Sequence, residues 1–149
     1  MRKEFVMRGQ TESGKTEVLN FSGFKSGMAY KLISFDLYPS TSVGATNVES
    51  IGSITAGKTA IAPADPDFND DALIATSYFV DNASSAVPVS AYSVVNDTFL
   101  ITQNLILMVQ DASGGSSPVN WQCRFKSVKM NASEETVNNY KQFMISDGS

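Results

Sequence analysis

Apolar and polar residues alternate along much of this chain with a period of two, which is the period of a β-strand with one buried face. The segment 31–38 is the clearest case. Its alternation predicts one face made of Leu32, Ser34, Asp36 and Tyr38, and an opposite face made of Ile33, Phe35 and Leu37. Similar patterns predict strands at about 3–9, 14–22, 29–38, 48–56, 73–81, 87–95, 98–110 and 118–130.

Two of these segments are apolar on both faces. Residues 73–80 and the run Leu105 to Val109 have few polar positions on either side. A strand of this kind is central in its sheet or is covered by another layer of protein, such as a neighbouring subunit. The run Leu105 to Val109 has more apolar surface than one small core easily absorbs, so a subunit interface or a second sheet is expected to cover the rest.

The connections are polar, and the end of the chain changes character. The loop 111–118 is predicted to be a long hairpin connection, and 57–72 is the longest stretch without a strand pattern. Asn131 and Glu134 form a helix N-terminal capping pattern. A stripe of Val137, Tyr140 and Met144 follows at helical spacing, so we expect a short helix at about 131–145 that packs on its own sheet.

Composition supports an all-β chain. Ser, Thr and Asn supply 40 of the 149 residues, and charged residues only 17%. We predict a single domain spanning 1–149: an antiparallel two-sheet sandwich, jelly-roll-like, of about eight strands, with a small closed barrel as the alternative.

Charge and residue content exclude several classes of function. The net charge is −4, which disfavours nucleic-acid binding, and Arg124, Lys126 and Lys129 are expected to point to solvent from one strand. The chain contains no histidine, and hence lacks the commonest general base and zinc ligand. Cys123 is expected to be a buried, inert thiol. We expect synthesis in the cytoplasm, with no signal peptide and no membrane span.

One string matches the phosphate-binding loop pattern G-x-x-x-x-G-K-[ST]. It runs from Gly9 to Thr16, with Gly14 and Lys15 at the defining positions. A true loop of this kind needs an apolar strand before it and a helix after it. Here Arg8 interrupts the strand and β-prone residues follow. We interpret the match as coincidental and predict a hairpin whose turn is 12–15, with positive φ at Gly14.

The acidic segment 65–71 places oxygen ligands at alternate positions, namely Asp65, Asp67, Asn69 and Asp71. Calcium prefers such ligands, but the EF-hand pattern wants glycine and glutamate where Asp70 and Thr76 stand. A looser calcium site and a solvated acidic loop are the two alternatives. We prefer the solvated loop, so no cofactor is assigned.

As a whole, the chain resembles the small, uncharacterised β-structured virion proteins found among phage structural genes. The features that carry this resemblance are the basic start 1–8, the segment 33–40, the Ser/Thr/Asn-rich strands and the expected terminal helix. The resemblance implies a capsid-associated, cement, penton or tail component, located in the virion, which binds itself and other virion proteins. It carries over no functional residues.

The favoured hypothesis is therefore a non-enzymatic assembly protein that acts as a homo-oligomer or as repeated copies on a shell, without nucleic acid or membrane as partner. The alternative is a soluble ligand- or carbohydrate-binding sandwich module, with calcium at 65–71. A small nucleotide hydrolase using Lys15 and Thr16 ranks third.

Overall fold

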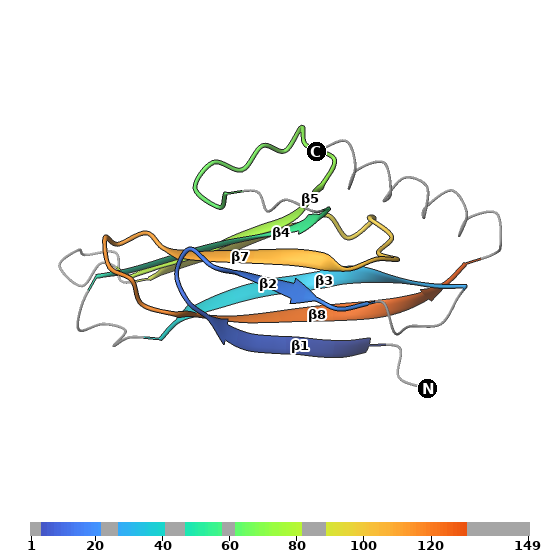
Figure 1. Cartoon of the computed structure of the whole chain (residues 1–149), viewed down its shortest axis with the longest axis horizontal. Helices are drawn as coiled ribbons and strands as arrows, with labels where there is room; N and C mark the ends of the chain where they lie inside the picture. The colour runs from blue at the N-terminus through green and yellow to red at the C-terminus, as the bar shows by residue number, and fades with distance from the viewer. Residues whose placement is uncertain (1–3, 22–26, 41–46, 58–61, 82–88, 131–149) are drawn as a thin grey trace.

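Two antiparallel β-sheets make up the protein in a computed structural model, which describes residues 4–21, 27–40, 47–57, 62–81 and 89–130 (Figure 1). These residues contain no helix, and so none long and apolar enough to cross a membrane. The helix expected at 131–145 lies outside the described residues. The strands are β1 (Glu4–Thr11), β2 (Thr16–Leu19), β3 (Met28–Pro39), β4 (Val48–Ala56), β5 (Leu73–Asp81), β6 (Ser90–Val95), β7 (Leu105–Asp111) and β8 (Val119–Lys129).

The order of the strands in each sheet follows a simple rule. One sheet has three strands in the order β1-β8-β3, and the other has five in the order β2-β7-β4-β5-β6. The pairs β1 with β8, β2 with β7 and β4 with β5 each join strands equally far from the middle of the chain. The corresponding pair β3 with β6 is not formed, and β6 is hydrogen-bonded to β5 at the edge of the five-stranded sheet.

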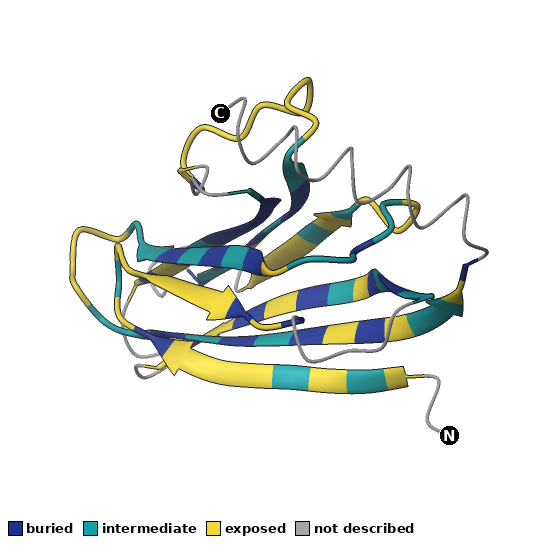
Figure 2. Ribbon diagram, turned by 45° about the vertical axis from the view of Figure 1, so that its right-hand side comes forward, coloured by how far each residue is buried: buried dark blue, intermediate teal, exposed yellow. Residues whose placement is uncertain are grey.

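The core lies between the two sheets, and the alternation of the sequence explains it. On β8, Val119, Trp121, Cys123 and Phe125 are buried while Arg124 and Lys126 between and beyond them are exposed. The stripes of buried and exposed residues on β3 and β8 are visible in Figure 2. On the facing sheet, Leu105, Leu107 and Val109 of β7 are fully buried.

Aromatic rings fill one end of this core. Phe125 of β8 stacks on Phe5 of β1 with ring centroids 5.4 Å apart, and it meets the edge of Phe21 at 5.0 Å. Tyr30 of β3 lies 5.3 Å from Phe21. Tilted and edge-on contacts at these distances add stability beyond the burial of area. Phe21 follows β2, so this cluster joins the two sheets.

The face assignment predicted for 31–38 is wrong in its first half, because the pairing of β3 with β8 shifts between Leu32 and Ser34. A β-bulge adds one residue to one strand and moves the following side chains to the other face. In β3 the additional residue is Ile33, whose side chain is exposed. Leu32, Phe35 and Leu37 therefore all point into the core. The exposed position of Ile33 lets three large side chains share one buried face.

Two connections predicted as hairpins instead cross between the sheets. The 12–15 turn has the predicted form, since Lys15 N–H donates to the Glu12 carbonyl over 3.1 Å and Gly14 has a φ of 79°. However, β1 and β2 belong to different sheets, and so do β7 and β8, which the loop 112–118 joins. A polar turn in the sequence marks where a strand ends, but it does not show which strand comes to lie beside it.

The strand predicted at 98–110 begins only at Leu105. The Asn96 side chain accepts hydrogen bonds from the backbone N–H and the hydroxyl of Thr98, which turns the chain after β6. Beyond this turn, Ile101 exchanges two backbone hydrogen bonds with Tyr30 of β3, of 2.7 and 2.9 Å. The connection between β6 and β7 therefore fastens the five-stranded sheet to the edge of β3.

The burial pattern predicts how the fold responds to loss of a ring. Phe125→Ala should lower the free energy of unfolding by about 3–5 kcal/mol, since it leaves a cavity among the rings described above. Phe68→Ala is the matched control, because Phe68 is 64% exposed, and it should cost less than about 1 kcal/mol. Urea unfolding monitored by circular dichroism measures both. Equal losses would contradict this placement of the core.

Candidate interaction surface

The side of the sandwich where β3 and β6 fail to pair is held together by side chains. The Ser93 hydroxyl of β6 donates to the Phe35 carbonyl on the edge of β3 over 2.5 Å. The Ser77 hydroxyl lies 2.7 Å from Ser93 Oγ and 3.4 Å from the Tyr92 carbonyl of the same strand. A short serine chain thus takes the place of a ladder of backbone hydrogen bonds.

A half-open groove lies along this side. It is lined by Asp36 and Leu37 of β3, Ser77 and Tyr78 of β5, and residues 91–93 of β6, with a volume of about 240 Å³. The lining combines polar side chains such as Asp36, Ser77 and Ser93 with the apolar Leu37 and Ala91. The groove offers polar contacts to a neighbouring molecule, but no nucleophile with an adjacent general base has been identified among its residues.

Next to this groove, apolar side chains are exposed on the outer face of β5 and β6. Tyr92 is 63% exposed and stands opposite Tyr78 across the two strands, with ring centroids 6.4 Å apart. Val94, two positions further along β6, is also exposed. Large apolar side chains that gather on one surface are more typical of an interface than of a surface that only meets water.

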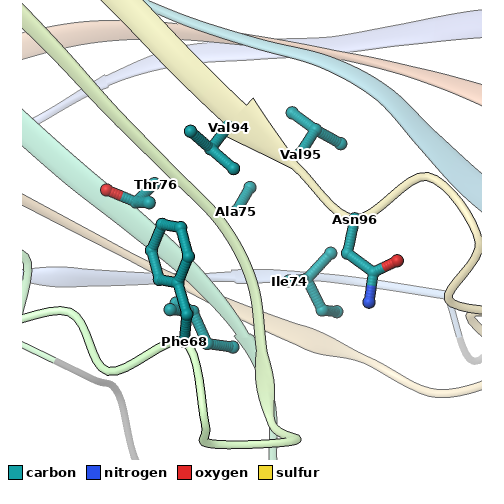
Figure 3. A pocket seen from close by; sticks show the side chains of 8 residues that line it. Phe68, Ile74, Ala75, Thr76, Val94, Val95 and Asn96 are labelled. Atoms are coloured by element: carbon teal, nitrogen blue, oxygen red, sulfur yellow. The ribbon is translucent and has the colours of Figure 1, made fainter.

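A second hollow continues this apolar surface. Phe68, from the connection between β4 and β5, lies beside Thr76, with Val94 and Val95 across β5 (Figure 3). Residues 73–76 and Asn96 complete the lining of a pocket of about 150 Å³. The pocket is small and mainly apolar, so it suits a side chain better than a large ligand.

The first residues of the string that matches a phosphate-binding loop pack against a tryptophan. Gly9 and Thr11 lie on β1 and face the indole of Trp121 on β8. A Cβ atom at Gly9 would come within 2.9 Å of this ring. The indole Nε1–H donates to Thr11 Oγ1 over 3.0 Å. The glycine therefore makes room for the tryptophan and the threonine binds it.

The rest of the string joins one sheet to the other. Gly14 N–H donates to the Val109 carbonyl over 2.8 Å, and Lys15 N–H donates to Glu12. These backbone amides are committed to the protein, and Thr16 begins a strand and not a helix. Lys15 and Thr16 are exposed. The geometry lacks the nest of free amides that a nucleotide phosphate requires.

The acidic segment forms turns stabilised by its own side chains. Asp67 Oδ1 accepts from Asn69 N–H over 2.9 Å, and Asp70 Oδ1 accepts from Ala72 N–H over 2.9 Å. Asp65 donates its N–H to the Ala62 carbonyl, and Asp71 is exposed. Within the described residues, no three His, Cys, Asp or Glu side chains gather closely enough to hold a metal ion.

Cys123 and the basic residues lie where the sequence indicates. Cys123 is fully buried, and this burial, with the negative charge of Asp36 as a smaller cause, raises the pKa of its thiol well above the ordinary value. Arg124, Lys126 and Lys129 are exposed on β8. The thiol therefore has little tendency to ionise, and the cations face solvent.

The sequence patterns did not single out Ser77, Ser93 or Asp111. Asp111 ends β7, and its carboxylate accepts from the Ser113 N–H, the Ser113 hydroxyl and the Ser117 N–H at 2.5–3.1 Å. Its own N–H donates to the Ser13 hydroxyl over 2.8 Å. Asp111 could have been found from the sequence, because a serine two residues after an aspartate favours a turn held by the carboxylate. No local signal marks the two serines, because their partners are distant in sequence.

Comparison of the chain with protein-family models, with curated proteins and with solved structures finds no match.

The contact between Trp121 and Thr11 predicts a stability effect inside the phosphate-loop string. Thr11→Val should lower the free energy of unfolding by about 1–3 kcal/mol, because it leaves the buried indole N–H without its acceptor. The control Lys15→Ala should leave stability unchanged.

A separate experiment tests the string as a nucleotide site. Titration calorimetry of the wild-type protein should detect no binding of Mg·ATP or Mg·GTP at millimolar concentration. Nucleotide binding that is lost in Lys15→Ala would contradict this interpretation.

Asp111 predicts a pH dependence. Burial favours a higher pKa, but the hydrogen bonds from Ser113 and Ser117 outweigh it, so the pKa of Asp111 lies below its ordinary value. A lowered folded-state pKa contributes stability above the unfolded-state value of about 3.9, and this contribution is lost as pH falls through the folded-state value.

The variant Asp111→Asn should therefore be less stable than the wild type at pH 7, and the difference should shrink below about pH 4. Asp97→Asn, at an exposed position, is the matched control for the loss of one carboxylate and should leave stability at pH 7 unchanged. Urea unfolding between about pH 7 and pH 3 measures both. A constant difference across this range would refute the role of the ionised carboxylate.

Proposed function

We propose that this chain is a non-enzymatic structural protein that works by assembly, as a virion component of the capsid-associated, cement, penton or tail kind. The single observation that carries the assembly role is the apolar surface on β5 and β6, where Tyr92 and Val94 are exposed beside Phe68. The virion setting rests on the resemblance in strand pattern and composition. The proposed partners are further copies of the chain and other virion proteins.

The order of the strands supports a jelly roll as the finer description of the fold. A jelly roll results when a long antiparallel hairpin is rolled so that strands equally far from its middle pair. Three such pairs are present, namely β1 with β8, β2 with β7, and β4 with β5. The fourth is replaced by the Ser93 bridge to Phe35. Jelly rolls are common in capsid proteins, and they occur in lectins as well.

The non-enzymatic part of the proposal rests on residue chemistry. The chain has no histidine, its one thiol is buried, and its phosphate-loop string is committed to packing and to backbone hydrogen bonds. The acidic turns at 65–71 use carboxylate oxygens to hold their own backbone. None of these features supplies an activated nucleophile or a preformed cofactor site.

The assembly proposal predicts self-association that resists salt. Light scattering at micromolar concentration should give a mass above that of one chain, and about 0.5 M NaCl should not abolish it, because the exposed surface on β5 and β6 is apolar. A strict monomer that also fails to bind candidate shell proteins would refute the proposal. Association that disappears in salt would assign it to charged surfaces instead.

A further inference from the structure

The edge of the five-stranded sheet at β6 differs from the other edges in its charge. The edge strands of the two sheets are β1, β3, β2 and β6. Three of them carry charged residues: Glu4 and Arg8 on β1, Glu17 on β2, and Lys31 and Asp36 on β3. Charged side chains on an edge strand oppose pairing with another strand. The sequence of β6, SAYSVV, carries no charge and no proline.

The edge of β3 is, in addition, partly occupied. Tyr30 gives both its N–H and its carbonyl to Ile101, and the Phe35 carbonyl accepts from Ser93. In contrast, Ser90, Ala91 and Tyr92 of β6 are exposed. Among the described edge strands, β6 is therefore the one that combines exposed residues with a sequence free of charge.

The register with β5 shows which groups of β6 face outward. Asn96 N–H donates to the Ile74 carbonyl over 2.8 Å, one position beyond the aligned pair Ala75 and Val95. Hydrogen-bonded and non-hydrogen-bonded pairs alternate in an antiparallel ladder. It follows that alternate β6 residues from Asn96 backwards bond to β5. The residues between them, Ala91, Ser93 and Val95, direct N–H and C=O away from the sheet.

We propose that β6 pairs with β6 of a second copy of this chain, antiparallel about a two-fold axis at Ser93, so that the two five-stranded sheets become one. This register places Ala91 opposite Val95 of the other copy and uses all three outward-facing residues of the strand. Each such pair exchanges two backbone hydrogen bonds.

The side chains on the outer face fit this register. It places Tyr92 opposite Val94 of the other copy, twice about the axis, and pairs of an aromatic with a β-branched side chain stabilise antiparallel strands. The nearest charge, Asp97, falls opposite Val89, so no charged residues meet. Self-pairing sets a strand against its own sequence, and a strand without charges avoids the repulsion that most other edges would meet.

This inference rests on the proposed assembly function and names its surface. The test compares two double variants of the full chain by analytical ultracentrifugation. Tyr92→Lys with Val94→Lys brings like charges together across the axis and should weaken dimerisation by about tenfold or more. Tyr92→Lys with Val94→Glu brings opposite charges together and should restore most of the loss. Val18→Lys, at a 61% exposed position on β2, is the edge control.

A third variant tests the same edge without adding charge, in case the double variants with lysine or glutamate fail to fold. Ala91→Pro removes an outward-facing N–H without touching the bonds to β5, and it should also weaken dimerisation. Circular dichroism checks the fold of every variant.

The outcomes separate this inference from the function on which it rests. Association that is unchanged in the like-charge and proline variants would overturn the β6 surface and leave the assembly function standing. Equal losses in both double variants would overturn self-pairing in this register and would mean that the two copies meet through these side chains in another geometry. A wild-type chain that neither self-associates nor binds shell proteins would overturn both.

Discussion

The fold depends on the burial of one face of each sheet against the other. Large side chains of β3 and β8 meet those of β4 and β7, and the contact is close enough that a Cβ atom at Gly52 would lie 3.0 Å from the Phe35 ring. Because burial of apolar area is the main favourable term in folding, every other feature must be compatible with this contact. The bulge at Ile33 is one consequence, since it turns Leu32 and Phe35 to the same side.

The second consequence concerns the sides of the sandwich. Two facing sheets must end in edge strands, and unpaired edges attract further strands. On one side, Ile101 and Ser93 fasten the five-stranded sheet to the edge of β3. On this side β6 is the edge strand of the five-stranded sheet, with Tyr92 and Val94 exposed on its outer face and no charge in its sequence. The proposed assembly surface therefore lies where the five-stranded sheet ends without a further strand.

The phosphate-loop string illustrates how context decides the chemistry of a motif. Its residues match the pattern in full. However, Gly9 leaves room for the Trp121 ring, Thr11 accepts a hydrogen bond from its indole N–H, and Gly14 forms the turn from one sheet to the other. A glycine within a strand at an inward position indicates close approach of another group, which is a signal that the sequence contains. The identity of that group, a tryptophan more than a hundred residues away, is not a local property.

What the sequence determines here is the strands: β4 and β5 have the predicted bounds, and β1, β3 and β8 agree within two residues, whereas β2, β6 and β7 are shorter than predicted. Alternation and turn residues are local, and they suffice for this. The tertiary structure decides which strands become neighbours, so that β1 and β2, or β7 and β8, lie in different sheets. It also decides the bulge at Ile33, the turn after Asn96 and the bridge from Ser93 to Phe35. The reason is physical: a strand's periodicity records that one face is buried, whereas its partner is chosen by contacts between residues far apart in the chain.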